Sequence, residues 1–98
     1  MPYKDEEARK EYMRNWSRKR RERNRDEVRE FKVQNGCTDC GYNLHHAALE
    51  FDHTDDKHAN VANLLSDTKR LWEEIAKCDV VCSNCHSIRT YNRTQMVL

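Results

Sequence analysis

The sequence predicts a small α+β domain built around a bound zinc ion and preceded by a charged helix. Two observations lead to this prediction: four of the five cysteines form two C-x2-C pairs, and the first third of the chain is highly charged and poor in apolar residues. The chain has 98 residues, of which 37% are hydrophobic and 36% are charged. The apolar core of so short a chain gives only marginal stability, so we expect a bound metal to supply part of the folding free energy. The same length excludes a Rossmann domain, a barrel, or any fold that encloses a large cofactor.

The chain carries no sequence signal for a membrane or for export. No run approaches the roughly 18 apolar residues that a membrane-spanning helix needs. The first ten residues lack the apolar segment of a secretory signal. We therefore expect a cytoplasmic protein, in which an odd number of cysteines at these spacings favours metal ligands over disulfides.

Residues 1–35 are predicted to form a basic helical arm, and residues 36–98 the zinc-bound domain. Residues 9–25 hold nine Lys and Arg against two Asp and Glu, whereas the balance after residue 32 is acidic. Long charged side chains without Gly or internal Pro favour a helix. Gly36 is predicted to end it, because glycine is the usual residue just past a helix C-terminus.

The arm offers few side chains that could be buried. Tyr12 and Trp16 are spaced i, i+4, and Val28 and Phe31 are spaced i, i+3, so each pair is predicted to pack one end of the helix onto the rest of the protein. Between the pairs we expect nothing to be buried. Such a surface is either simply hydrated or contacts nucleic-acid phosphates. The candidate phosphate contacts are Arg14, Arg18, Lys19, Arg20, Arg21, Arg23 and Arg25.

Four cysteines have the spacing of a structural zinc site. Cys37 and Cys40 form one C-x2-C pair, and Cys82 and Cys85 form the second. Together they supply four thiolates, the number that closes a tetrahedral zinc site. Cys78 is left over, and we expect it to behave as a small buried hydrophobic residue.

Between the cysteine pairs the sequence predicts a strand. Within the predicted strand at residues 47–53, apolar and acidic residues alternate from Leu49 to Asp52, which places Leu49 and Phe51 on one side and Glu50 and Asp52 on the other. Polar residues 54–57 follow and are typical of a turn.

Two helices and a short extended run complete the predicted domain. Residues 67–77 are predicted to form a helix with Ser66 as its N-cap. An extended run at residues 79–81 leads into the second cysteine pair, and residues 83–92 form a last helix that carries His86 and Arg89 on one face. The apolar stripe of the first helix, expected to face the core, consists of Leu71, Trp72, Ile75 and Ala76.

If the four paired cysteines complete the coordination of the zinc, then Asp52, His53 and His86 have no structural role. Neighbouring residues of a strand point to opposite faces, so Asp52 and His53 serve different partners. One carboxylate and one imidazole leave most of a divalent ion's coordination shell open for water and phosphate oxygens, as phosphodiester hydrolysis requires. A neutral histidine can remove the proton from the attacking water.

Other interpretations of these residues stay open. His86 could replace Cys82 or Cys85 as a zinc ligand, and Asp52 could cap a turn. The three remaining histidines are expected to be ordinary polar surface residues: His45, His46 and His58.

Taken together, these motifs resemble the HNH endonucleases. The resemblance rests on C-x2-C-G at residues 37–41, Leu-Glu-Phe-Asp-His at residues 49–53 and Val-Cys-Ser-Asn-Cys-His at residues 81–86, and it covers residues 33–93. The chain is most similar to the small, zinc-stapled members common in bacteriophages. The resemblance implies a ββα-metal fold, two strands and a helix around one catalytic ion. It also implies that Asp52 and His86 bind Mg2+ or Mn2+, that His53 is the general base, and that the four paired cysteines hold the zinc.

The chain departs from the family pattern at the middle Asn, whose usual position is occupied by Lys77. That Asn orients the loop that carries the general base. Asn60 and Asn63 lie in the linking region, but nothing in the sequence assigns this role to either. Arg89, one turn after Cys85, is interpreted as a phosphate contact or transition-state cation, with an exposed surface arginine as the alternative.

The resemblance implies a metal-dependent DNA endonuclease that leaves 5′-phosphate and 3′-hydroxyl ends. One active site per chain predicts nicking of one strand of double-stranded DNA. Phage relatives imply terminase or portal proteins as partners and, for a phage-encoded chain, the host cytoplasm as location. Two alternatives are a zinc-bound nucleic-acid-binding module without chemistry, and an adaptor whose charged helix binds an acidic protein.

Overall fold

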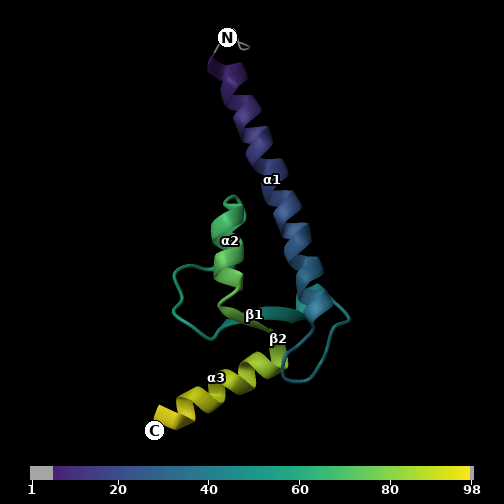
Figure 1. Cartoon of the computed structure of the whole chain (residues 1–98), viewed down its shortest axis with the longest axis vertical. Helices are drawn as coiled ribbons and strands as arrows, with labels where there is room; N and C mark the ends of the chain where they lie inside the picture. The colour runs from purple at the N-terminus through teal and green to yellow at the C-terminus, as the bar shows by residue number, and fades with distance from the viewer. Residues whose placement is uncertain (1–5, 98) are drawn as a thin grey trace.

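The computed structural model describes residues 6–97, so the first five residues of the predicted arm and the last residue of the predicted domain lie outside it. Three helices and one two-stranded sheet are arranged as in Figure 1. The helices are α1 (Glu6–Asn35), α2 (Thr68–Ile75) and α3 (Ser83–Val97); the strands are β1 (Leu49–His53) and β2 (Cys78–Cys82). Two short 3-10 helices precede β1 and α2, at His46–Ala48 and Val61–Leu64. The predicted α+β class is confirmed. Within residues 6–97, no helix is both long and apolar enough to cross a membrane.

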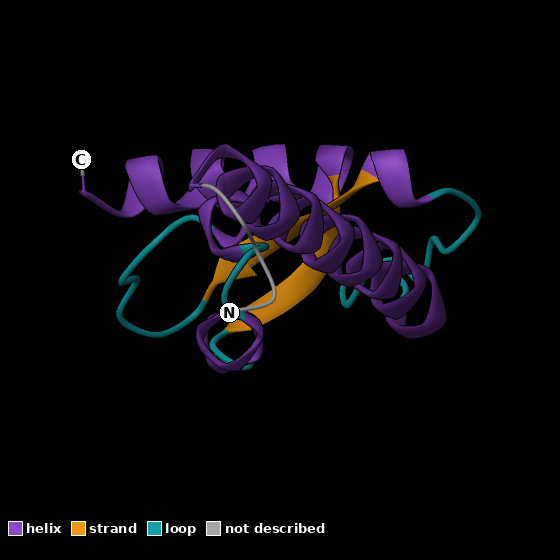
Figure 2. Ribbon diagram, turned by 90° about the horizontal axis from the view of Figure 1, so that it is seen from above, coloured by secondary structure: helices purple, strands orange, loops and turns teal. Residues whose placement is uncertain are grey.

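The sheet is an antiparallel pair that connects both cysteine-containing segments. Leu49 pairs with Cys82 at one end, and His53 pairs with Cys78 at the other. The strand begins at Leu49, two residues later than the sequence predicts, because His45 Nδ1 accepts a hydrogen bond from the Ala47 N–H and folds residues 46–48 into the 3-10 helix. Figure 2 shows the two strands crossing between the helices.

Helix α1 packs onto the domain mainly through its C-terminal half. Val28 is buried, and the Phe31 ring lies 5.4 Å from the Trp72 ring in an edge-on contact. Tyr12 and Trp16 are about half exposed, and the Trp16 ring stacks on Arg20 of the same helix, so neither side chain enters the core. The predicted end is confirmed: Gly36 has φ +69° and its N–H donates to the Lys32 carbonyl.

The expectation that the middle of α1 buries nothing is wrong. Asn24 is fully buried, and its Nδ2 donates to the Leu65 carbonyl at 2.8 Å and to Thr68 Oγ1 at 3.1 Å. Because a buried amide must find partners, this side chain ties α1 to the start of α2.

Helix α2 is shorter than predicted and has a different cap. Asp67, not Ser66, is the N-cap, since its Oδ1 accepts a hydrogen bond from the Arg70 N–H. The predicted stripe is confirmed at Leu71 and Ile75, which are buried, but Ala76 is exposed.

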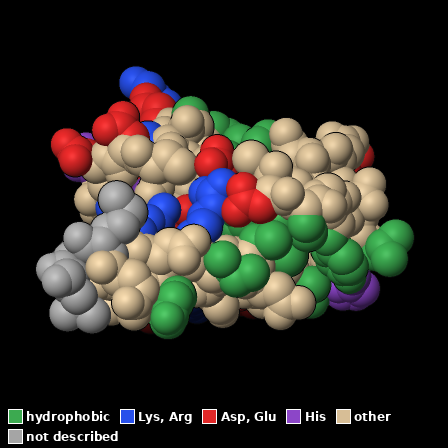
Figure 3. Space-filling view, turned by 90° about the horizontal axis from the view of Figure 1, so that it is seen from below, with side chains coloured by type: hydrophobic (Ala, Val, Ile, Leu, Met, Phe, Trp, Pro, Cys, Tyr) green, Lys and Arg blue, Asp and Glu red, His purple; other side chains and the backbone are tan. Residues whose placement is uncertain are grey.

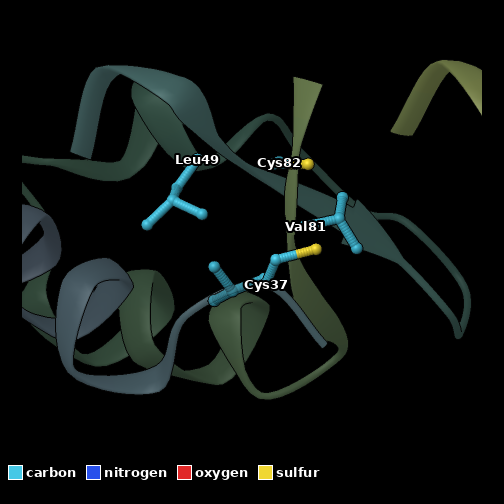
Figure 4. Packing of buried hydrophobic residues seen from close by; sticks show 5 residues of the cluster. Cys37, Leu49, Val81 and Cys82 are labelled. Carbon is cyan, nitrogen blue, oxygen red and sulfur yellow. The ribbon is translucent and has the colours of Figure 1, made fainter. Parts of the chain in front are cut away.

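Two apolar clusters form the core, one on each side of Phe31 and Phe51. The first joins the sheet to the first cysteine pair and is shown in Figure 4, where Cys37 and Cys82 lie beside Leu49 and Val81. The second joins α1 to α2 and consists of Val28, Leu64, Leu71 and Ile75. Phe31 and Phe51, with ring centroids 6.4 Å apart, contact both clusters. The core therefore fixes β1 between the cysteine segments and helices α1 and α2.

Candidate functional site

The four paired cysteines meet in one cluster. One ligand atom from each of Cys37, Cys40, Cys82 and Cys85 lies within 4.8 Å of the others, and the Sγ atoms of Cys40 and Cys82 are 3.7 Å apart. A tetrahedral zinc ion with bonds of about 2.3 Å separates its sulfur ligands by about 3.8 Å. The cluster therefore fits zinc, as the sequence predicts. All five cysteines are free of disulfides.

Backbone hydrogen bonds around the cluster favour the ionised form of its cysteine sulfurs. In the first turn, the Gly41 N–H donates to the Cys37 carbonyl, and Gly41 has φ +82°. In the second, the Cys85 N–H donates to Cys82 Sγ at 3.4 Å. Burial opposes ionisation of Cys37, but nearby backbone N–H groups, foremost that of Cys82, outweigh it and lower the pKa of this thiol to about 6. Hydrogen bonding with Cys82 raises the pKa of Cys85, because several thiols share one small space and do not all ionise without a cation.

Cys78 lies outside this cluster. Its Sγ donates to the Glu74 carbonyl at 3.4 Å, and burial raises its pKa to about 11. A half-buried, protonated thiol agrees with the predicted structural role.

Asp52 is buried and faces α3. Its side chain is 4% exposed, and Arg93 donates to both of its oxygens, at 2.9 and 2.7 Å. Arg89 also donates to Asp52 Oδ2, at 2.7 Å. The hydrogen bonds from Arg93 are the largest cause that lowers the pKa of Asp52, to about 2, so this carboxylate is ionised at neutral pH.

His86 lies between two acidic side chains of β1. Its Nδ1 is 2.7 Å from Glu50 Oε1, and its Nε2 is 3.7 Å from Asp52 Oδ1. An ionised carboxylate accepts hydrogen bonds only, so His86 Nδ1–H donates to Glu50 Oε1, and Nε2 is the ring nitrogen that faces Asp52. A carboxylate behind a histidine in this way is the usual support of a metal ligand.

Asp52 and His86 offer one carboxylate oxygen and one imidazole nitrogen, donor types that divalent cations take. At ligand distances of about 2.1 Å, adjacent and opposite ligands of an octahedral ion are about 3 and about 4 Å apart. The 3.7 Å between His86 Nε2 and Asp52 Oδ1 falls between these two separations, so holding such an ion requires one of the two side chains to shift. Arg93 is half exposed and contacts the same carboxylate, so it competes with any such cation.

His53 points away from this pair. Its Nε2 is 3.0 Å from Oε2 of Glu74 on α2, and its side chain is 14% exposed. Glu74 is itself buried, although it carries a charge. The same carboxylate accepts hydrogen bonds from the His58 N–H and from Lys77 Nζ; burial raises its pKa, but these contacts outweigh it and lower the pKa below its usual value. The structure therefore joins Asp52 and His86 but places the His53 imidazole on the other face of β1.

Arg89 is held by three carboxylates. It donates to both oxygens of Asp39 at 2.7 Å, to Asp52 at 2.7 Å and to Asp79 at 3.0 Å, and its side chain is 20% exposed. The hydrogen bonds that Arg89 donates to Asp39 are the largest cause that raises the pKa of Arg89. Figure 3 shows basic side chains enclosed by acidic ones on the lower face of the molecule. Arg89 thus links the first cysteine turn to both strands, and its role as a phosphate contact stays a prediction.

Three residues near the predicted site were missed by the sequence analysis: Glu50 as a partner of His86, Glu74 as a partner of His53, and Arg93 as a partner of Asp52. For two of them, Arg93 and Glu74, the sequence spacing contained a signal. Arg93 follows Arg89 by one helical turn, and Glu74 is spaced i+3 from Leu71 on the buried face of α2.

Comparisons with models of protein families, with curated proteins and with solved structures find no match for this chain. The assignment of a function therefore depends on the chemistry of the side chains described above.

The cysteine cluster gives the first testable prediction. Cys85→Ser removes one of four thiolates, so we expect loss of bound zinc and of the cooperative thermal transition, since structural zinc supplies folding free energy. Metal content by mass spectrometry and circular dichroism measure both effects.

Cys78→Ser is the matched control, because Cys78 lies outside the cluster. It should retain one zinc ion per chain and the transition. Equal zinc content in the Cys85→Ser protein and the wild type would contradict a four-cysteine site.

Proposed function

We propose that the protein is a metal-dependent DNA endonuclease of the HNH type, which nicks one strand of double-stranded DNA. The observation that supports this most is the arrangement of Asp52 and His86. A buried carboxylate and an imidazole with a carboxylate behind it face each other at 3.7 Å, beside the half-exposed guanidinium of Arg93. A structural zinc domain does not need this arrangement.

In the proposed reaction Asp52 and His86 hold one Mg2+ or Mn2+ ion. When bound, that ion supplies positive charge for the scissile phosphate and the leaving 3′ oxygen. Glu50 keeps the ring of His86 in the tautomer that presents Nε2. Arg93 turns from Asp52 to a phosphate oxygen, a movement that its 53% exposure allows. Arg89 holds Asp52 in place and adds positive charge nearby.

His53 is the proposed general base. Because the Glu74 carboxylate accepts the hydrogen bond from Nε2–H, Nδ1 of a neutral ring keeps its lone pair and can take the proton from water. His53 is the last residue of β1, so substrate must pass around the end of the strand to contact both His53 and the Asp52–His86 pair.

Glu74 takes over the orienting role of the missing middle Asn. Lys77 occupies the usual Asn position, and its Nζ donates to Glu74 Oε1 at 3.3 Å. Glu74 is therefore fixed by Lys77 and the His58 N–H while its Oε2 holds the His53 ring. The proposed partners are double-stranded DNA and, for a phage-encoded chain, terminase or portal proteins.

A nucleic-acid-binding module without chemistry is the second candidate. The contacts of Arg89 and Arg93 with Asp52 favour it, because they satisfy both carboxylate oxygens without a metal. This candidate predicts zinc as the sole bound metal and no cleavage.

Conversion of supercoiled plasmid to open circles tests the proposal. Zinc-loaded wild type should nick plasmid when Mg2+ or Mn2+ is added, and His53→Ala should lower the rate by about 100-fold or more, as expected for loss of a general base. His58→Ala is the matched control, since its backbone N–H is kept and its side chain is exposed.

The control should nick at the wild-type rate. Absence of nicking by the wild type with every metal would reject the endonuclease proposal. Equal rates for wild type and His53→Ala would indicate a contaminating nuclease or a different base.

A separate prediction concerns Glu74. Glu74→Gln should lower kcat by about 10- to 100-fold with little change in KM, because a neutral amide no longer fixes the tautomer or stabilises the imidazolium. Glu74→Asp, which keeps the charge, should restore part of the rate. A change in KM alone, or equal rates for Gln and Asp variants, would show that Glu74 acts only through the fold.

A further inference from the structure

We propose that one face of α1 binds the phosphate backbone of duplex DNA and leads it toward the candidate active site. This face, called here the α1 stripe, consists of Arg14, Arg18, Arg21, Arg25, Arg29 and Lys32. The inference rests on the proposed function and deepens it by naming the surface that receives the substrate. It separates the cations of α1 that contact DNA from those that do not.

The spacing of the stripe matches the helix period. Successive members are three or four residues apart, and the 18 residues from Arg14 to Lys32 make about five turns of 3.6 residues. The six side chains therefore follow one face over about 27 Å, the length of about eight 3.4 Å steps along a DNA strand. In Figure 1 the N-terminal part of α1 extends beyond α2, which leaves much of the helix surface uncovered.

The charges of the stripe are available to an external anion. All members except Lys32 are classed as exposed. Among the ion pairs of residues 6–97, none involves Arg14, Arg18, Arg21 or Arg25; Arg29 has one contact with Asp26, at 4.0 Å. This contrasts with Arg89, whose guanidinium is used by three carboxylates.

The stripe ends in a hollow beside β1. The hollow has a volume of about 430 Å³, and Arg25, Arg29 and Lys32 form its basic side. Leu49 and Phe51 belong to its apolar side. Cations beside an apolar wall suit a sugar–phosphate backbone, which alternates charged phosphates with largely apolar sugar faces.

One lining residue connects the hollow to the candidate active site. Glu50 lines the hollow, and its Oε1 accepts the hydrogen bond from His86 Nδ1. A DNA strand that follows the stripe into the hollow therefore arrives next to His86.

Other cations of α1 lie on different faces. Arg20 stacks on the Trp16 ring at 3.8 Å and donates to the Ser66 carbonyl, so it is part of the fold. Lys19 and Arg23 are one turn apart and, at 100° per residue, each lies more than a quarter turn from both Arg21 and Arg25 of the stripe. They provide a charge-matched control within the same segment.

The test compares two double variants in the His53→Ala background, so that bound DNA stays intact. Zinc-loaded Arg21→Gln/Arg25→Gln and Lys19→Gln/Arg23→Gln proteins are titrated with a labelled duplex at several salt concentrations, without added Mg2+. The stripe variant should lower the slope of log K against log salt by about two, because each lost phosphate contact removes about 0.9. The control variant should keep the wild-type slope. Glutamine preserves helix propensity, and circular dichroism checks that both variants are folded.

Equal reductions of the salt slope in both double variants would overturn the proposal and show that DNA is attracted by net charge alone. No reduction in either would show that α1 does not contact DNA. Preferential binding of single-stranded RNA of equal length would also overturn it. Plasmid nicking is measured separately: nicking by the wild type with an unchanged stripe slope refutes the stripe alone, whereas stripe-dependent binding without nicking refutes the endonuclease proposal alone.

Discussion

The convergence of four cysteine sulfurs is the constraint on which the rest of the structure depends. Cys37 and Cys40 follow α1, whereas Cys82 and Cys85 stand where β2 becomes α3. A zinc ion held by these four sulfurs would join segments more than 40 residues apart in a chain with a small apolar core. The sheet also fixes the start of α3 against β1, since Cys82 pairs with Leu49. The position of His86, directly after Cys85, follows from the same connection.

The polar side chains of β1 face two different helices. Its alternation turns Glu50 and Asp52 toward α3, where they meet His86, Arg89 and Arg93. The next residue, His53, turns toward α2 and the buried Glu74. Each polar group thereby has a charged partner, which a buried carboxylate requires. The same division keeps the proposed base apart from the proposed metal ligands.

Much of this arrangement could be predicted from the sequence. The cysteine spacing, the alternation in β1 and the end of α1 at Gly36 depend on local rules of ligand number, strand period and glycine geometry. Partners across the fold were harder to predict, since Glu50, Glu74 and Arg93 acquire their roles from tertiary packing. Asn24 is an instructive case: it precedes Val28 and Phe31 by four and seven residues, so the helix period places it on the buried face although it is polar. The N-cap of α2 was predicted one residue too early, because Ser66 and Asp67 are both good capping residues.

The most direct test of the central claim, a divalent-ion site at Asp52 and His86 separate from the zinc, is a titration of the zinc-loaded protein with Mn2+, followed by water-proton relaxation. We predict one Mn2+ site per chain in the wild type, its loss in Asp52→Asn with zinc content unchanged, and its retention in Asp56→Asn, a control at an exposed position. Equal Mn2+ binding by wild type and Asp52→Asn, or no binding by the wild type, would contradict the claim.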